Sequence, residues 1–168
     1  FTFMNNISTN FNSDITDNTP NASKVLNSLR YLDYTSETAI LDIIDNSIDA
    51  NAKKIDLWII SDDDNSIKQI DVIDNGLGMD QATLNESIKL GSLLEKNETH
   101  DLGKFGMGLV TSSISLGRSL RVLTKKSNVK NFDCYEAIQD LDIIARENKF
   151  IKTLATKQCP NEIYLMGE

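Results

Sequence analysis

The sequence is short of the residue types on which many metal and redox sites depend. Among its 168 residues there is one histidine, His100, and there are two cysteines, Cys134 and Cys159, which stand far apart. Structural zinc sites need closely spaced pairs of cysteine or histidine ligands, so this composition argues against a His-based metal centre. Reduced cysteines in a cytoplasmic protein are the simplest interpretation of so few of them.

Long apolar runs and an excess of positive charge are also missing. No apolar stretch approaches the roughly 20 residues of a membrane-spanning helix, and the first residues lack the basic and apolar regions of a signal peptide. The formal net charge of −8 argues against a surface built mainly for nucleic acid or anionic lipid. We expect no membrane partner, and nucleic acid to be contacted only through regions outside this chain.

The remaining composition is that of one globular domain with room for a core. Hydrophobic residues make up 40% and charged residues 25% of the chain, which are ordinary values. Residues 1–22 are rich in Asn, Thr and Ser, and we expect an irregular segment there that precedes a domain over residues 23–168.

Periodicity and turn residues predict helices alternating with short strands. We expect helices over residues 23–34, 37–51, 81–90 and 109–116, with a further helix favoured over 140–150. Strands are expected over 54–60, 67–73, 120–124, 132–138 and 163–166, the first two joined as a hairpin by the turn SDDDNS. This order predicts an α/β (α+β) two-layer sandwich, with helices over one face of a mixed β-sheet.

The helix over residues 37–51 separates into an apolar and a polar side. The apolar side carries Ile40, Leu41, Ile43, Ile44 and Ile48, and the polar side carries Asp42, Asp45, Asn46 and Asp49. One interpretation is a core-facing helix with a solvated acidic face. The other is a cation site, in which the Asn46 amide oxygen binds Mg²⁺ and the Asp42 carboxylate one turn away orients and deprotonates a water.

Two glycine-rich turns follow this helix. In DNGLGMD (74–80), Gly76 and Gly78 permit close approach of the backbone to a flat ring, Asp74 can accept from an exocyclic amine, and Asp80 is expected to cap the next helix. An ordinary turn after a strand is the alternative. In LGKFGMGL (102–109), after a polar stretch typical of a lid, backbone N–H groups at a helix start suit phosphates. Its context fits neither a Rossmann site nor a Walker A loop.

The order of the three motifs is more specific than any one of them. DIIDNSIDA (42–50), DNGLGM (74–79) and LGKFGMGL (102–109) resemble the N, G1 and G2 boxes of the GHKL ATPases, which have the Bergerat fold. LGRSLRVLTK (116–125) adds a further match, and the resemblance covers about residues 24–126. The residues of these motifs are most similar to those of the Morc-type and MutL-like branch, and next to those of the heat-shock chaperone ATPases.

The resemblance implies ATP bound with Mg²⁺ between the helices, under a lid. It assigns the metal to Asn46, the adenine-reading role to Asp74 and the general base to Asp42. The other residues that it places around the nucleotide are Ala50, Lys53, Gly78, Met79, Ser92, Gly103, Lys104, Phe105, Gly106, Met107, Gly108 and Leu109. It also implies an ATP-dependent homodimer.

Two departures from the family pattern affect the expected activity. Asp42 stands where these ATPases usually carry Glu, and a misplacement of about 1 Å costs on the order of a hundredfold in rate. No match is found for the family's late-strand threonine or for the lysine of its following domain, so we expect the chain to be part of a longer protein. The alternatives to a slow ATPase are a non-hydrolysing nucleotide switch, a histidine kinase catalytic domain, and a structural protein that binds no nucleotide.

Overall fold

A computed structural model describes residues 17–31, 35–91, 108–128 and 133–159. The helices are α1 (Ala22–Arg30), α2 (Ser36–Asp49), α3 (Gln81–Ser87), α4 (Gly108–Leu116) and α5 (Leu141–Glu147). The strands are β1 (Ile55–Ser61), β2 (Ile67–Asp74), β3 (Ser119–Thr124), β4 (Asp133–Asp140) and β5 (Thr153–Gln158). Every predicted element in these ranges is present, with ends that differ by a few residues. β5 was not predicted, and the strand expected over 163–166 lies outside the described residues.

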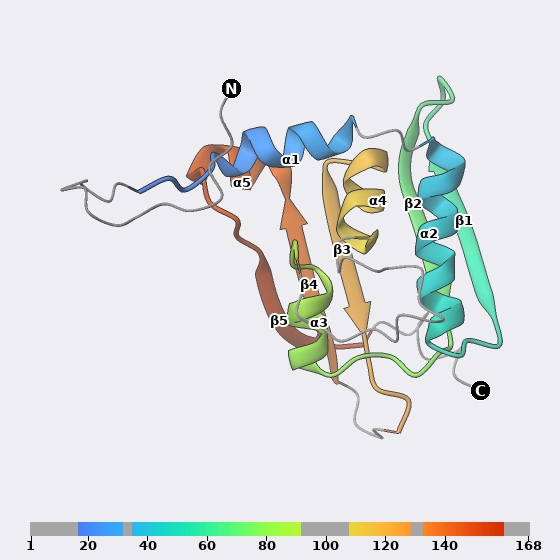
Figure 1. Cartoon of the computed structure of the whole chain (residues 1–168). Helices are drawn as coiled ribbons and strands as arrows, with labels where there is room; N and C mark the ends of the chain where they lie inside the picture. The colour runs from blue at the N-terminus through green and yellow to red at the C-terminus, as the bar shows by residue number, and fades with distance from the viewer. Residues whose placement is uncertain (1–16, 32–34, 92–107, 129–132, 160–168) are drawn as a thin grey trace, which may run out of the picture.

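The described strands form two antiparallel sheets. One is the hairpin β1–β2 with Leu57 opposite Val72, and the other has the order β3–β4–β5. Helices lie along both sheets, α2 against β1–β2 and α4 against β3, so the predicted class of helices layered on a sheet is confirmed (Figure 1). The expected mixed sheet is not formed by these strands, because every ladder among them is antiparallel and β2 shares no ladder with β3.

A single apolar cluster forms the core, and it belongs to the half of the molecule that contains the three-stranded sheet. Its buried members are Ala22, Leu26, Leu84, Ile88, Val110, Ile114, Ala137, Leu141 and Ile144. They come from α1, α3 with its C-cap Ile88, α4, α5 and β4, with Leu120 and Val122 of β3 packed against them. Within the described ranges, no residue of α2, β1 or β2 belongs to this cluster.

Helix α2 buries a different face from the one that its hydrophobic pattern predicts. Thr35 caps the helix by accepting from the Thr38 N–H, and the buried side chains are Ala39 and Ser47. Leu41 and Ile48 are 56% and 57% exposed. The inward face is therefore rotated by roughly a quarter turn from the apolar side, and the prediction that Leu41 and Ile48 lie in a core is wrong.

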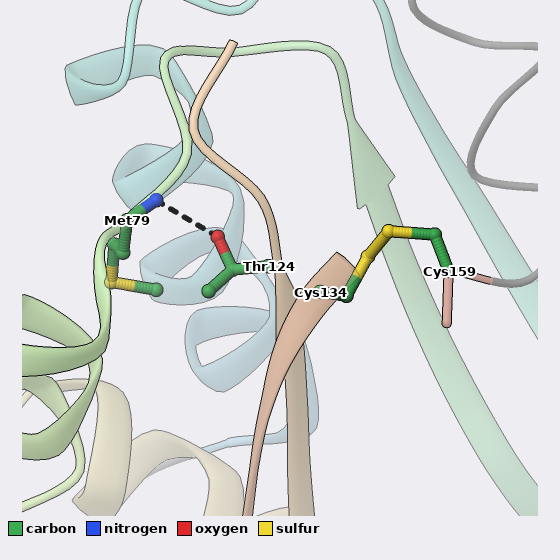
Figure 2. The surroundings of a disulfide bond; sticks show 4 residues. All are labelled: Met79, Thr124, Cys134 and Cys159. Atoms are coloured by element: carbon green, nitrogen blue, oxygen red, sulfur yellow. Dashed lines mark hydrogen bonds between the residues drawn. A yellow bond between two sulfur atoms is a disulfide. The ribbon is translucent and has the colours of Figure 1, made fainter. Parts of the chain in front are cut away.

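The two cysteines are joined in a disulfide, so the prediction that they are reduced is wrong. Cys134 lies near the start of β4 and Cys159 follows β5 directly, and the pairing of these strands brings them together (Figure 2). Their separation of 25 residues concealed this pairing in the sequence. The disulfide therefore ties β5 to the centre of its sheet.

Helix α2 is the longest helix among the described residues, and it is only 14 residues long. No helix in these ranges has both the length and the apolar character needed to cross a membrane.

Candidate functional site

The inward face of α2 brings polar side chains towards the interior of the molecule. Asp42 lies about one turn before the adjacent residues Asn46 and Ser47, and all three are partly or fully buried. The Asn46 amide nitrogen donates to the Asp42 carbonyl oxygen at 2.7 Å. Because this bond uses the nitrogen, the amide oxygen is the atom that remains for a cation.

Asp74, at the end of β2, is fixed by two short contacts. Its Oδ2 accepts from the Ser47 hydroxyl at 3.1 Å, and its Oδ1 accepts from the Gly76 N–H at 2.8 Å. Each carboxylate oxygen has a further lone pair, so the group can still accept from an amine of a ligand. The Ser47 contact joins the first motif to the second, and the sequence analysis did not identify Ser47 as a site residue.

The loop after β2 is bound to the end of α2 on one side. The Leu77 N–H donates to the Ala50 carbonyl oxygen at 2.8 Å. A Cβ on Gly76 would lie 2.7 Å from the same oxygen, so only glycine fits this approach. The Asn75 Oδ1 accepts from the N–H groups of Lys53 and Lys54 at 2.8 and 2.9 Å. Ala50 and Lys53 thus contact the second motif through their backbones.

On its other side the same loop is bound to the end of β3. The Met79 N–H donates to Thr124 Oγ1 at 2.9 Å, and the Ser127 N–H donates to the Leu77 carbonyl oxygen at 3.0 Å. Gly78 has a φ of +63°, and a Cβ there would lie 1.9 Å from the Lys125 carbonyl oxygen. The loop over residues 75–79, which we call the bridging loop, therefore connects the two sheets.

Asp80 ends the second motif and begins α3, as predicted. Its Oδ1 accepts from the Thr83 N–H at 2.9 Å, and its Oδ2 lies 3.1 Å from Lys126 Nζ. The capping bond to the Thr83 backbone, aided by the Thr83 hydroxyl and Lys126, lowers the pKa of Asp80 to about 2. Asp80 therefore fastens the bridging loop to the next helix and to the segment after β3.

The described part of the third motif lies beside the first. A Cβ on Gly108, the first residue of α4, would lie 3.6 Å from Asp42 Oδ2, so the base candidate is next to the helix start. Leu109 packs against the hydrophobic core. The remaining predicted residues, Ser92, Gly103, Lys104, Phe105, Gly106 and Met107, lie outside the described residues.

The donor set around Asn46 fits magnesium bound together with a phosphate ligand. Across the described ranges, no group of three or more His, Cys, Asp or Glu side chains could bind a metal ion on its own. Mg²⁺ is commonly bound by one or two protein oxygens, with waters and substrate phosphates completing its shell. An Asn46 oxygen with the Asp42 carboxylate one turn away suits that mode.

The structure brings together Asp42, Asn46, Asp74 and Gly108 from three separate elements, α2, β2 and α4. Comparison with protein families shows to which family the chain belongs. A family model described as "Histidine kinase-, DNA gyrase B-, and HSP90-like ATPase" matches residues 34–164. The chain belongs to this ATPase family. The match contains every element from α2 to β5, and the two-layer arrangement of helices and antiparallel strands agrees with the fold of the family.

Curated relatives place the chain near one branch of the ATPase family. It is 32% identical to "ATPase MORC2B" of Mus musculus over 92 residues, which cover 54% of this chain and 9% of that protein. It is 33% identical to "ATPase morc-1" of Caenorhabditis elegans over 92 residues, 55% of this chain and 10% of the relative. "Protein MICRORCHIDIA 5" of Arabidopsis thaliana is 31% identical over 96 residues, 54% of this chain and 13% of the relative. The matched part is thus about a tenth of each relative.

Proposed function

We propose that this ATPase-family domain binds ATP with Mg²⁺ in the space between α2, the bridging loop and the start of α4. The observation that carries the proposal is the hydrogen bond from Ser47 to Asp74. It sets the amine-accepting carboxylate beside the helix that presents Asn46 and Asp42. Adenine would donate its exocyclic amine to Asp74, and the phosphates would extend towards Asn46 and the N–H groups at the start of α4.

The proposed role of each side chain follows from its chemistry. Asn46 would bind the metal, whose charge neutralises the phosphates, and Asp42 beside Gly108 would orient the attacking water and accept its proton. Lys104 would reach a phosphate from the third motif. The proposed reaction is slow conversion of ATP and water to ADP and phosphate, because the Asp42 carboxylate is one methylene shorter than the usual Glu.

Binding is tested with Mg-ADP and a matched pair of variants in one strand. Asp74→Asn removes the acceptor, while Asp71→Asn makes the same change three residues earlier, on the opposite face of β2. With ligand at about 100 times its dissociation constant, the wild-type chain should gain roughly 2.7 kcal/mol of stability. We expect Asp74→Asn to weaken binding at least about tenfold and Asp71→Asn to leave it unchanged. Calorimetry without heat and a melting curve without a shift would overturn nucleotide binding.

A non-hydrolysing switch is the second candidate, because Asp42 is shorter than the usual base. Turnover should be measured in the full-length protein for the wild type, Asp42→Asn and Asp42→Glu. Turnover that Asp42→Asn abolishes, with Mg-ADP affinity retained, supports the ATPase. Turnover that is absent in the wild type and gained in Asp42→Glu supports the switch. Phosphotransfer to a histidine of another protein would instead support the kinase alternative.

Nucleotide-driven homodimerisation completes the proposal. Sedimentation of the full-length protein should show a dimer with a non-hydrolysable Mg-ATP analogue, and a monomer under that condition would overturn this part. The disulfide weighs against a reducing compartment, since structural disulfides are rare in the cytosol. Thiol alkylation of the protein in intact cells measures directly whether Cys134 and Cys159 are oxidised.

A further inference from the structure

The backbone of Met79 is bound by one side chain from the other sheet. Thr124, the last residue of β3, is 8% exposed, and its hydroxyl oxygen accepts from the Met79 N–H at 2.9 Å. Figure 2 shows the hydroxyl directed at this amide. We propose that Thr124 is a positioning residue, which holds the backbone of Gly78 and Met79 where it would contact the nucleotide base. This inference rests on the proposed function.

The neighbouring contacts make the position of the loop sensitive to this bond. The Gly78 backbone already approaches the Lys125 carbonyl so closely that a Cβ would lie 1.9 Å from it. The bridging loop therefore has no room to move towards β3. The Thr124 hydroxyl prevents movement in the opposite direction, away from β3, and the two contacts together define one position for Gly78 and Met79.

Other contacts of the loop do not replace the hydroxyl. The Ser127 to Leu77 bond joins two backbones and fixes Leu77, two residues before Met79. The Lys126 to Asp80 ion pair is roughly half exposed on both sides, and such pairs stabilise little. Without the hydroxyl, the partly buried Met79 N–H would need another acceptor, because an unpaired amide in that setting is costly. Movement outward to water would satisfy the amide and displace the loop from the base.

Two substitutions separate the hydroxyl from the shape of the side chain. Thr124→Val keeps the branched shape and removes the acceptor, and Thr124→Ser keeps the acceptor and removes a methyl group. Thr156→Val is the matched control, because Thr156 and Thr124 both pair with Tyr135, in one row across the three-stranded sheet. The same change is thus made in the same sheet, away from the loop.

The experiment measures the exchange rate of the Met79 amide in the free chain and the dissociation constant for Mg-ADP. We expect Thr124→Val to raise both about tenfold, as loss of one partly buried hydrogen bond implies. Thr124→Ser should restore both to near the wild-type values, and Thr156→Val should change neither. A merely structural role would lower the melting temperature without this selective loss and rescue of affinity.

The outcomes distinguish this inference from the proposed function. If the wild type binds Mg-ADP and Thr124→Val binds it equally well, the positioning role is wrong and nucleotide binding stands. Equal weakening in Thr124→Ser and Thr124→Val would also overturn the role of the hydroxyl. If the wild type itself does not bind Mg-ADP, both the proposed function and this inference fail.

Discussion

The two sheets of this molecule differ in how they are stabilised. The three-stranded sheet is covered by α1, α3, α4 and α5, and the buried cluster comes from these helices, from β4 and from Ile88 directly after α3. The β1–β2 hairpin is accompanied by α2 and supplies none of them. Its strands leave Leu57, Trp58, Ile59, Ile60 and Ile67 between 43% and 60% exposed.

The comparison separates the residues that stabilise the fold from those that form the site. Asn46 and Asp74 belong to the half with little apolar burial, and that half is bound to the core-containing half through the bridging loop. Sites are commonly built on such less stable parts, where chemistry and stability compete. Substitutions in the two halves should therefore differ in whether they change stability or binding.

The largest effect should come from the core. Ile144→Ala removes a fully buried side chain of α5 and should lower the free energy of unfolding by about 4 kcal/mol, from lost transfer energy and the cavity left behind. Ile59→Ala makes the same change in β1, where the side chain is 53% exposed, and should cost about 1 kcal/mol or less. Urea unfolding measures both, and equal losses would show that the two halves are equally stabilised.

The next largest loss of stability should come from removing the disulfide, which lies in the half that contains the three-stranded sheet. The double variant Cys134→Ala with Cys159→Ala opens a loop whose ends are 25 residues apart, which should cost about 3 kcal/mol through the entropy of the unfolded chain. Wild-type protein treated with a reductant is the control for the substitutions. A melting temperature unchanged by either treatment would contradict the stabilising role.

A pair of glycine substitutions tests how tightly the bridging loop is packed. Gly78 and Gly91 both have positive φ, +63° and +67°, but only Gly78 has a backbone carbonyl where its Cβ would lie. Gly91→Ala should cost about 1 kcal/mol from conformation alone, and Gly78→Ala about 2 to 3 kcal/mol with the added clash. Chemical denaturation of both variants checks the difference. Similar costs would mean that the loop moves freely away from β3.

The smallest effect should be a pH dependence at Asp80. Because its pKa is lowered to about 2 from an ordinary value near 3.9, the stabilisation is complete above about pH 4 and is lost as pH falls towards 2. Asp80→Asn keeps a capping oxygen but removes this dependence. The difference in melting temperature between the two proteins should shrink between about pH 4 and pH 2. A constant difference would show that Asp80 is not stabilised in its charged form.

The sequence predicted the elements well where their signals are local. Asp80 caps a helix as expected, and the β-branched runs on either side of the acidic turn form the hairpin. β5 was missed because its sequence, TLATKQ, has little apolar content, as is usual for a strand at the edge of a sheet. Pairing of β5 with β4 is also what joins Cys134 to Cys159, so the disulfide was missed for the same reason.

The sequence named the candidate site residues, but it did not name the residues that support them. The order of the motifs identified Asn46 and Asp74, whereas Ser47, Asn75 and Thr124 support them through contacts between distant segments. The amphipathic pattern of α2 was misleading because the inward face carries Ala39, Asn46 and Ser47 rather than the large apolar side chains. Leu41 and Ile48 are exposed for that reason. The rule that apolar residues lie inside therefore does not hold for this helix.

The missing ladder between β2 and β3 has a consequence for cooperativity. The β1–β2 hairpin is a separate hydrogen-bonded unit, and such a unit can open at a lower free energy than global unfolding. A nucleotide that contacts Asp74, Asn46 and the bridging loop would bind only when both units are closed. Bound ligand should therefore slow amide exchange in the hairpin more than in β4.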